Sequence, residues 1–524
     1  MLIDLQEEPS LERLRADVII IGAGAVGLTM AVEMARSGSQ ILLLEAGGPS
    51  VTAESQVFFE SARSIGRPLR GLHLGRFRAL GGTTTFWGGQ LAALDPLIYR
   101  HRPWVADTEW PIAHADAALY YNRVFSLLGM TQQIPDDAEV WRRLRVLQPE
   151  DTTDLEFFFT RWAPEANFAR LFATDIQRSQ NLTVVANAPV AALQVDSTGR
   201  RVMHVEIHAV GKGPIRACAD NFVMTNGAIE TPRLLLSKLA NGQAAPWARN
   251  PWIGRGFMDH LECIAGTVTP LDRRRFHNLF DNAFLDGIKY QPKIKLSEHG
   301  QVSRKLLSVA AHLIFKATIS EHVSNARIFF KAALRGKLDV LKYPAQLVSL
   351  ARYSMPMIRR YLRDHRVYNL VDRGIELSLS MEQKPLASSA IMLRDDSDAL
   401  GMPLIDVDWR VDGAELETLA SFAELLRDYL ERNGLASLQI VPSLVNRDIA
   451  FMTAAHDTSH HMGTTRMASD PKSGVVDGNL NVYGTDNLFV AGAGVYPTCG
   501  FQNPTLTAMA LGIRLADALR AAKL

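Results

Sequence analysis

The chain has few cysteines, almost no net charge and no long apolar run. Only three of its 524 residues are cysteine, and Cys218, Cys263 and Cys499 lie far apart, without CxxC or other metal-ligand spacing. The 56 Lys and Arg residues nearly balance the 55 Asp and Glu residues, which excludes a global field that attracts nucleic acid or an acidic membrane. No stretch approaches the roughly 20 apolar residues of a membrane span. These absences predict a soluble, cytoplasmic protein with reduced thiols and no nucleic-acid partner.

What the chain does contain is the composition of a folded protein. Hydrophobic residues make up 47% and charged residues 21%, which suits two domains with sizeable cores rather than disorder. Near the N-terminus, Arg13 and Arg15 precede an apolar segment in the manner of a signal peptide. Glycines interrupt that segment with a regular spacing, so we interpret it as part of the fold.

A glycine-rich motif follows the first β-branched run. The sequence "GAGAVG" comes next, before an Ala- and Met-rich stretch typical of a helix. In such a strand, turn and helix, Gly22 permits the turn, Gly24 lets the backbone approach a pyrophosphate, and Gly27 lets helix and strand pack closely. A second strand at 41–44 ends in Glu45, which suits a carboxylate that binds ribose hydroxyls. The pattern predicts a bound dinucleotide and leaves NAD and FAD open.

A second glycine-rich stretch, "GRFRALGGTTTFWGGQ", spans residues 75–90. Its glycine doublets let the backbone pack against a planar or phosphate-bearing ligand, although a tight loop below a sheet has the same composition. Further along, "NFVMTNGAIETPRLLL" indicates a strand at 222–225, a turn at Gly227 and a helix that opens near Thr231-Pro232. We expect a second phosphate-side turn there.

The last segment of the chain predicts a strand, a loop and a helix. A short strand at 488–490 leads to a glycine pair, and "YPTCGFQNP" follows. We expect a helix at 505–519, with Pro504 at its first position and Asn503 as its N-cap. A long Rossmann-like start completed by such a chain end is typical of flavin domains.

The middle of the chain differs from the rest in its residue pattern and composition. Between about 266 and 447, alternating segments such as "GIELSLSMEQ" and "PLIDVDWRV" predict a separate, substrate-facing sheet. Residues 325–366 combine aromatic, aliphatic and basic side chains with few acids. That composition favours a packed cap or dimer arm with a solvated basic face, and it also suits a helix that lies on a membrane or docks a redox partner.

Two adjacent histidines begin "HHMGTTRM" at residues 460–467. Three interpretations are open for them: a metal site, packed core histidines, and a base that removes a hydroxyl proton as a hydride leaves the carbon. His456, His460 and His461 can place two metal ligands together, but no carboxylate or cysteine motif completes a zinc set. We therefore expect no metal.

Six segments together resemble the glucose-methanol-choline (GMC) oxidoreductases, in the branch of pyranose oxidases, glycoside 3-oxidases and sugar dehydrogenases. The segments are "VIIIGAGAVG", "LGGTTTFWGG", "TNGAIETPRLLL", "IGRGFMDH", "HHMGTTRM" and "NLFVAGAGVYPT…NPTLTAMALGIRLADAL". The resemblance is specific across the flavin segments and weak at 266–447. It implies FAD as the cofactor. It also implies an α/β fold, in which a discontinuous Rossmann-like FAD-binding domain (1–100, 180–265 and 448–524) accompanies a sheet-based substrate-binding domain with helical insertions (101–179 and 266–447).

The resemblance assigns two catalytic residues. His460 matches the histidine of the HxxGTxxM pattern, and Asn503 of "NPT" matches its active-site partner. His461 falls outside the pattern, so we interpret it as a supporting or core residue, and we interpret His260 of "IGRGFMDH" as structural rather than as a base. Where covalent relatives have a histidine before the Trp of the second glycine-rich stretch, this chain has Phe86, so we expect noncovalent FAD.

The predicted cofactor-binding residues come from all the flavin segments. They are Gly22, Gly24, Gly27, Glu45, Gly81, Gly82, Thr83, Thr85, Trp87, Val190, Gly227, Gly492, Ala493, Asn503, Pro504 and Thr505. The N-terminus of the helix at 505 is expected to stabilise negative charge on the reduced flavin.

The predicted function is oxidation of a secondary alcohol, the ring hydroxyl of a sugar, glycoside or cyclic polyol, to a ketone. Hydride moves to flavin N5, His460 is the base, and oxygen, a quinone or a redox protein accepts the electrons. A flavin-retaining lyase and a membrane-associated electron-transfer flavoprotein are the alternatives. Assembly into a homo-oligomer stays open.

Overall fold

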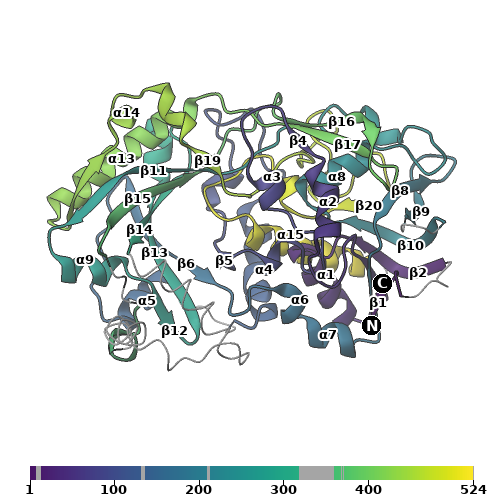
Figure 1. Ribbon diagram of the computed structural model, residues 1–524, viewed down its shortest axis with the longest axis horizontal. Helices are drawn as coiled ribbons and strands as arrows, with labels where there is room; N and C mark the ends of the chain where they lie inside the picture. The colour runs from purple at the N-terminus through teal and green to yellow at the C-terminus, as the bar shows by residue number, and fades with distance from the viewer. Residues whose placement is uncertain are drawn as a thin grey trace, which may run out of the picture.

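Two large β-sheets form the body of the protein and lie side by side (Figure 1). The computed structural model describes residues 1–7, 13–130, 136–208, 213–317, 359–367, 369 and 371–522. Most of the basic segment predicted at 325–366 lies outside these residues.

The sheet that carries the first glycine-rich motif has a parallel centre. Its strand order is β1-β7-β3-β2-β10-β9-β8, and β20 also pairs with β10. All pairings are parallel except those of β9 with β8 and with β10. The bounds are β1 (Leu2–Asp4), β2 (Arg13–Ile21), β3 (Ile41–Leu44), β7 (Leu182–Ala186), β8 (Val190–Val195), β9 (Val202–Ile207), β10 (Ile215–Met224) and β20 (Leu488–Val490). Strands buried on both faces read as unbroken aliphatic runs, which explains the sequence at 18–21 and 41–44.

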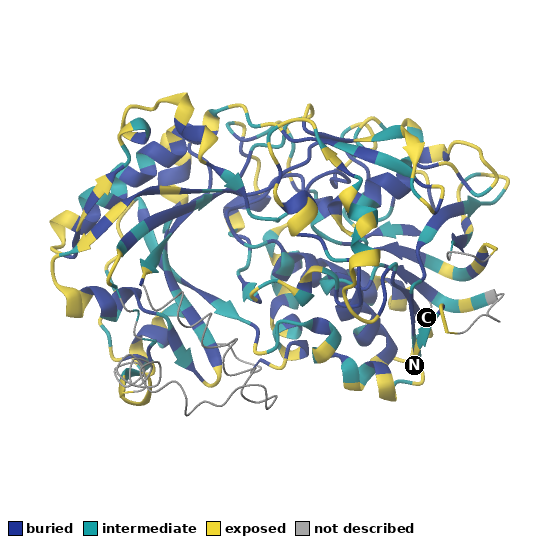
Figure 2. Cartoon of the chain, viewed as in Figure 1, coloured by how far each residue is buried: buried dark blue, intermediate teal, exposed yellow. Residues whose placement is uncertain are grey.

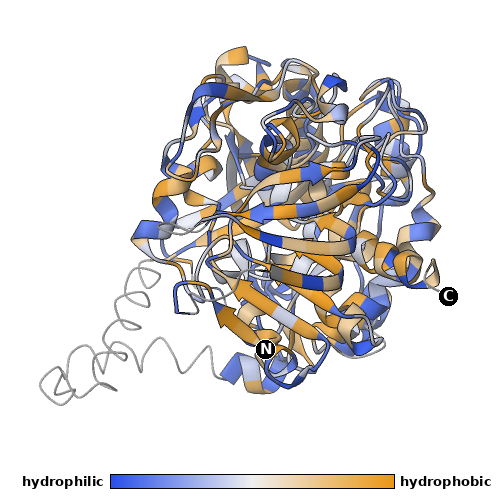
Figure 3. Ribbon diagram, turned by 90° about the vertical axis from the view of Figure 1, so that its right-hand side faces the viewer, coloured by the Kyte–Doolittle hydropathy of each residue, from blue (hydrophilic) through white to orange (hydrophobic). Residues whose placement is uncertain are grey.

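Helices from both ends of the chain pack together beside this first sheet. Helix α15 (Thr505–Ala521) packs against α1 (Ala25–Arg36) and α4 (His114–Leu127). A Cβ on Gly512 would lie 3.0 Å from side-chain atoms of Val26 and Met30, so the close approach of α15 to α1 depends on this glycine. The termini lie near each other in Figure 1, and Figure 3 shows hydrophobic residues along the strands at this end of the molecule.

The second sheet is antiparallel. Its order is β18-β11-β15-β14-β13-β6-β5, with β12 paired to β13 and β19 to β11. The bounds are β5 (Gln90–Leu91), β6 (Leu155–Trp162), β11 (Leu261–Pro270), β12 (Ala283–Leu285), β13 (Ile288–Leu296), β14 (Val309–Lys316), β15 (Gly374–Met381), β18 (Ala436–Ile440) and β19 (His456–Asp457). Helix α13 (Ala414–Arg432) covers the outer face, so the other face looks toward the first sheet (Figure 1).

A third, small sheet corrects one prediction. The segment "PLIDVDWRV" was expected in the substrate-facing sheet, but β17 (Pro403–Asp408) pairs with β16 (Ala390–Ser397) and, in parallel, with β4 (Arg63–Ser64). Alternation of polar and apolar residues shows that a strand has one buried face, but it does not show which sheet the strand joins.

Helix α8 (Gly227–Leu236) begins earlier than expected. The predicted opening near Thr231-Pro232 was wrong, because Pro232 lies inside the helix. Proline has no N–H, so it leaves a helical carbonyl four residues earlier without its usual donor. Thr464 Oγ1 donates to that carbonyl, on Ala228, at 2.6 Å. Thr464 of the "HHMGTTRM" segment therefore supplies the hydrogen-bond donor that Pro232 lacks.

The start of α15 also differs from its prediction. The helix begins at Thr505, Pro504 occupies the N-cap position, and no side chain caps the first turn. Asn503 was expected as the cap, but its amide contacts His460 instead.

Shorter elements surround the two large sheets, and most of their exposed residues lie on the outside (Figure 2). They include α2 (Ala53–Glu60), α3 (Gly71–Leu74), α5 (Asp137–Arg143), α6 (Phe168–Leu171), α7 (Ala173–Arg178), α9 (Arg273–Phe280), α10 (Glu298–Arg304) and α14 (Pro442–Val445). Within the described part of the chain, no helix combines the length and the apolar character needed to cross a bilayer. The predicted α/β fold with two sheet-based regions is confirmed.

Candidate active site

A cavity of about 540 Å³ extends from the carboxyl ends of the parallel strands to His460 and Asn503. Most of the predicted cofactor-binding residues line it: Gly22, Gly24, Glu45, Gly82, Thr83, Trp87, Val190, Gly227, Gly492, Ala493, Asn503, Pro504 and Thr505. Gly27, Gly81 and Thr85 are not among the lining residues. The cavity thus brings together residues from the first and the last parts of the chain.

The first glycine-rich motif leaves open space for a ligand at one glycine and none at the other two. A Cβ on Gly22, where φ is +103°, would lie 2.8 Å from the Asn226 Cα, and one on Gly27 would lie 2.0 Å from the Gly22 oxygen. Around Gly24, by contrast, no heavy atom lies within 4 Å of an added Cβ. Gly24 is also the uncapped N-cap of α1. The free N–H groups of this helix start fit a pyrophosphate.

Glu45 follows strand β3 directly, as predicted, and backbone N–H groups donate hydrogen bonds to its carboxyl group. Its Oε2 accepts from Ala23 N at 2.9 Å and its Oε1 accepts from Gly47 N at 2.8 Å. Burial raises the pKa of the carboxyl to about 7, against the opposing effect of these N–H donors. Each oxygen keeps a second lone pair, so the side chain suits hydroxyl donors of a ribose.

The second glycine-rich stretch packs directly on the first. A Cβ on Gly82 would lie 3.1 Å from the Gly24 Cα, so both backbones border the same part of the cavity. Thr84, which the sequence analysis did not select, is buried, donates to the Gly81 carbonyl at 2.6 Å and accepts from Phe168 N at 3.1 Å. It fixes the loop rather than offering its hydroxyl to a ligand.

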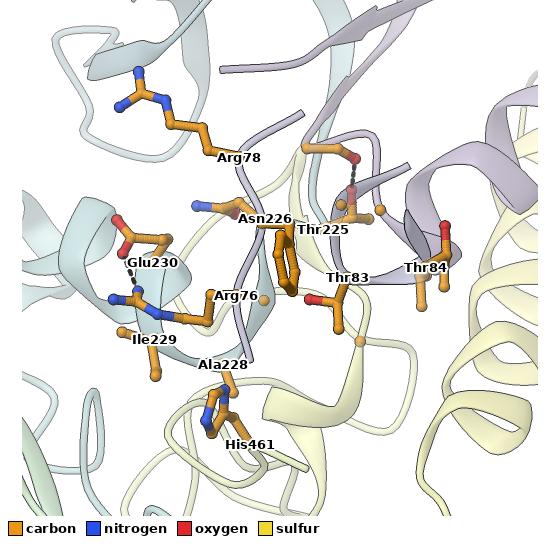
Figure 4. Close-up of a pocket in the computed structure, with 18 of the residues that line it drawn as sticks. Arg76, Arg78, Thr83, Thr84, Thr225, Asn226, Ala228, Ile229, Glu230 and His461 are labelled. Atoms are coloured by element: carbon orange, nitrogen blue, oxygen red, sulfur yellow. Dashed lines mark hydrogen bonds and ion pairs between the residues drawn. The ribbon is translucent and has the colours of Figure 1, made fainter. Parts of the chain in front are cut away.

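Two arginines of "GRFR" were missed from the sequence. Arg76 lines the cavity and pairs with Glu230 at 2.6 Å, and Figure 4 shows it pointing to that carboxylate. Arg78 points in another direction and donates to the Ala46 carbonyl at 3.2 Å. In the sequence, the signal for these arginines was a pair of basic residues, two positions apart, just before a glycine doublet. The Arg78 guanidinium group raises the positive charge near Glu45.

His460 and Asn503 meet at one end of the cavity. The Asn503 Nδ2 lies 3.0 Å from the His460 Nε2, although 43 positions separate the residues in sequence. With the amide nitrogen as donor, Nε2 of the imidazole carries no proton and accepts. Burial lowers the pKa of His460 to about 4, with a further lowering by Lys293 and an opposing effect of Glu262. The ring is therefore neutral near pH 7.

The second ring nitrogen of His460 has two partners. Its Nδ1 lies 2.7 Å from Thr458 Oγ1 and 2.9 Å from the Nδ1 of His260. If Nε2 accepts, Nδ1 carries the proton and donates to these two atoms. His260 is fully buried, and burial lowers its pKa well below the usual value, so it accepts as a neutral ring.

Asp259 holds the backbone that carries His460. Its Oδ1 accepts from His460 N at 3.0 Å, from Thr458 N at 3.1 Å and from Thr458 Oγ1 at 3.3 Å. Asp259 is completely buried, and burial together with the charge of Asp457 raises its pKa to about 8. No local pattern in the chain pairs Asp259 with Thr458, because 199 positions separate them.

His461 lies beside the same carboxyl group. Its Nε2 is 3.7 Å from the Asp259 Oδ2, and burial lowers the pKa of His461 to about 3. The side chain also borders the cavity, close to Arg76 in Figure 4. Among the described residues, no group of three or more His, Cys, Asp or Glu side chains is placed to hold a metal ion.

Two family models match this chain. Residues 385–512 match the model described as GMC oxidoreductase, and residues 17–61 match the model described as FAD binding domain. The first match contains His460 and Asn503, and the second contains the first glycine-rich motif with Glu45.

Several characterised proteins are similar to the chain. The fructose dehydrogenase large subunit of Gluconobacter japonicus is 21% identical, over 97% of this chain and 98% of its own. Paromamine 6′-oxidase of Streptomyces fradiae is 27% identical, over 96% and 91% respectively. C-glycoside 3-oxidase of Arthrobacter globiformis is 35% identical over 118 residues, which are 22% of this chain and 21% of its own.

Solved structures share the fold. A crystal structure of formate oxidase aligns with a TM-score of 0.57 and 15% identity, over 98% of this chain and 99% of its own. Pyridoxine 4-oxidase from Mesorbium loti aligns with a TM-score of 0.58 and 16% identity, over 97% and 99%.

The matched family models and the similar proteins define the class of this protein as an FAD-dependent oxidoreductase. Residues 385–512 form its GMC oxidoreductase domain, and residues 17–61 belong to its FAD-binding domain. It is an FAD-dependent enzyme that acts on alcohol donors, and the predictions of family, enzyme class and FAD are confirmed.

Proposed function

We propose that the enzyme oxidises a ring hydroxyl of a sugar, glycoside or cyclic polyol to a ketone. The observation that carries the proposal is the 3.0 Å contact between the His460 Nε2 and the Asn503 Nδ2 at the end of the cofactor cavity. The similarity to two oxidases named for carbohydrate-like substrates supports it. Bound FAD supplies the acceptor for the hydride.

His460 acts as the base in this proposal. A hydroxyl group that replaces Asn503 as the donor to Nε2 places its proton on a neutral imidazole, which can accept it as the hydride leaves the carbon. The proton already on Nδ1 stays with Thr458 and His260, so the ring can take a second one only at Nε2. The imidazole therefore faces the substrate in the reactive tautomer.

Asn503 and helix α15 take the supporting roles. The amide of Asn503 is held beside Nε2 and can hydrogen-bond the same alcohol oxygen, which fixes the direction in which the carbon–hydrogen bond points. The first turn of α15 has no side-chain cap, and its N–H groups and dipole stabilise negative charge next to it. One short segment thus orients the substrate and balances charge.

The proposal includes noncovalent FAD. Phe86 lines the cavity, is 69% exposed and stacks on Phe77 with ring centroids 5.0 Å apart. A phenyl ring offers no atom for a bond to the flavin. Acid precipitation of the purified enzyme should leave the flavin absorbance in the supernatant; yellow protein in the pellet would contradict this part of the proposal.

Anaerobic flavin reduction tests the proposed reaction. Monosaccharides, glycosides, inositols and sterols are mixed in turn with the oxidised holoenzyme. At least one polyhydroxylated ring should bleach the flavin absorbance and yield a ketone with two hydrogens fewer. Bleaching by sterols alone would overturn the assignment to carbohydrate-like substrates. Cleavage without bleaching would favour a lyase. Oxygen, quinone and dye reduction with the same substrate then identify the acceptor.

A further inference from the structure

A group of polar side chains lies on the inner face of the second sheet. In β13, the residues from Ile288 onward alternate between buried and half-buried, and Lys293 belongs to the half-buried set. Gln291 belongs to the same set, and its Oε1 accepts from Gln90 Nε2 at 2.9 Å. Because Gln90 lines the cofactor cavity, this face of β13 continues the wall of the active site.

The sheet register assembles four side chains on that face. Ser378 pairs with His312 on the neighbouring strand, and its Oγ donates to the Glu262 Oε1 at 2.8 Å. The His312 Nε2 lies 3.6 Å from the same Glu262 oxygen. His312 extends the row toward β13, whose Ile294 pairs with the residue before it. We call Glu262, Lys293, His312 and Ser378 the sheet cluster.

The sheet cluster adjoins the catalytic pair. Lys293 pairs with Phe158 in the register, and the ring of Phe158 lies 5.3 Å from that of Phe501, two positions before Asn503. The charges of Glu262 and Lys293 both act on His460, in opposite directions. The two charged side chains of the sheet cluster therefore lie within electrostatic range of the proposed base.

The side chain of Lys293 differs from that of its neighbour Lys295 in having no partner for its charge among the described residues. Its ammonium makes no hydrogen bond or ion pair within the described chain, whereas Lys295, two positions on, pairs with Asp95 at 2.8 Å and Glu156 at 3.2 Å. Burial lowers the pKa of Lys293 to about 8, which shows how poorly the site solvates the charge. The His312 Nδ1 is buried and likewise unpartnered.

We propose that the sheet cluster binds two hydroxyl groups of a neutral, polyhydroxylated substrate, other than the hydroxyl that reacts. Lys293 donates to one hydroxyl oxygen and Glu262 accepts from the other hydroxyl. This inference rests on the proposed function and names the substrate chemistry that the same site selects.

Charge balance favours a neutral substrate over a charged one. The cluster contains one ammonium and one carboxylate, and burial, together with the charge of Lys293, lowers the pKa of His312 to about 4, so its imidazole is neutral. A substrate carboxylate would meet Glu262, and a substrate ammonium would meet Lys293. Two hydroxyl groups satisfy both side chains, and a site built for hydroxyls rejects an analogue that lacks one.

Binding to the reduced holoenzyme separates this inference from turnover. With its FAD reduced by dithionite under anaerobic conditions, the enzyme cannot oxidise an alcohol, and calorimetry measures the Kd for D-glucose, methyl glucosides and myo-inositol. Lys293→Met and Glu262→Gln should each raise the Kd of the sugar that binds best at least about tenfold. For the monodeoxy sugar that lacks the contacted hydroxyl, each variant should match the wild type.

Lys316 and Glu376 provide matched controls. They form an exposed ion pair at the rim of the same sheet, so Lys316→Met and Glu376→Gln make the same charge changes away from the cluster. These two variants should keep the wild-type Kd. Thermal melting of all four variants checks that the sheet remains folded.

The outcomes distinguish this inference from the proposed function. A sugar that binds through the cluster without bleaching the oxidised flavin would refute the reaction and support the cluster. If the sugar bleaches the flavin but its Kd is unchanged in both cluster variants, the binding role of the cluster is refuted and the proposed reaction stands. In that case water solvates Lys293 in the cavity of about 40 Å³ that it lines with His312. Binding of gluconate or glucosamine in preference to glucose, or of no polyol at all, would also overturn it.

Discussion

The Thr458 hydroxyl lies 2.7 Å from the His460 Nδ1 and 3.3 Å from the Asp259 Oδ1, so one threonine connects the proposed base to a buried carboxyl group. If the hydroxyl donates to Asp259, its oxygen is free to accept from the imidazole. This direction of the hydrogen bonds leaves the His460 Nε2 unprotonated toward the cavity.

Thr458→Val should slow anaerobic flavin reduction about tenfold. The substitution keeps the shape but removes the acceptor at Nδ1, and loss of one such hydrogen bond in the transition state corresponds to about 1.4 kcal/mol. Thr458→Ser keeps the hydroxyl and should remain within about threefold of the wild type. Equal rates for Val and Ser would show that Thr458 does not orient the base.

The pH dependence of flavin reduction should have an unusually acidic limb. A protonated imidazole cannot accept the substrate proton, so the rate falls as pH drops through the pKa of His460, which burial lowers to about 4. The rate should therefore be flat from about pH 6 to 8 and decline near pH 4. Lys293→Met should shift the limb upward, because this cation lowers the pKa of His460. A limb near pH 6.5 would contradict the buried, neutral base.

Asp259→Asn should stabilise the protein more at high pH than at low pH. The folded pKa of Asp259, about 8, lies above its unfolded value, so its contribution is fully present in acid and is lost as pH rises toward 8. The asparagine side chain keeps an Oδ1 acceptor but has no carboxyl group that can ionise. We expect the melting temperature of the variant to exceed that of the wild type by more at pH 9 than at pH 6, in saturating FAD. A constant difference would argue against the buried acid.

Gly22→Ala should abolish tight FAD binding, with Gly38→Ala as its control. Both glycines have a positive φ, +103° and +93°, so alanine strains both. Only at Gly22 would the new methyl group meet backbone, the Asn226 Cα at 2.8 Å. The purified Gly22→Ala protein should lack flavin, while Gly38→Ala should retain it at the wild-type ratio. Equal flavin content in the two variants would refute the steric account of the motif.

The sequence allowed the cofactor half of the site to be predicted better than the substrate half. Local spacing defines the turn at Gly22 and the carboxylate at Glu45, because strand, turn and helix are adjacent in the chain. Asp259 and Thr458 come together only through tertiary packing, so no local pattern revealed them.

The substrate sheet shows a second limit of the sequence. Alternation indicated strands at 374–383 and 403–411 but did not assign the second one to the small sheet of β4, β16 and β17. Likewise, Lys293 and Glu262 come from different strands, and only the register places them on one face. The roles of His460 and Asn503 came from the family pattern rather than from composition.

Replacement of the proposed base tests the account most directly. The rate of anaerobic flavin bleaching by the best sugar should fall at least about 10²-fold in His460→Ala, whereas His73→Ala, on the exposed side of α3, should match the wild type. The flavin content and melting temperature of both variants establish that each is folded holoenzyme. Undiminished bleaching in His460→Ala would contradict the assignment of His460 as the base.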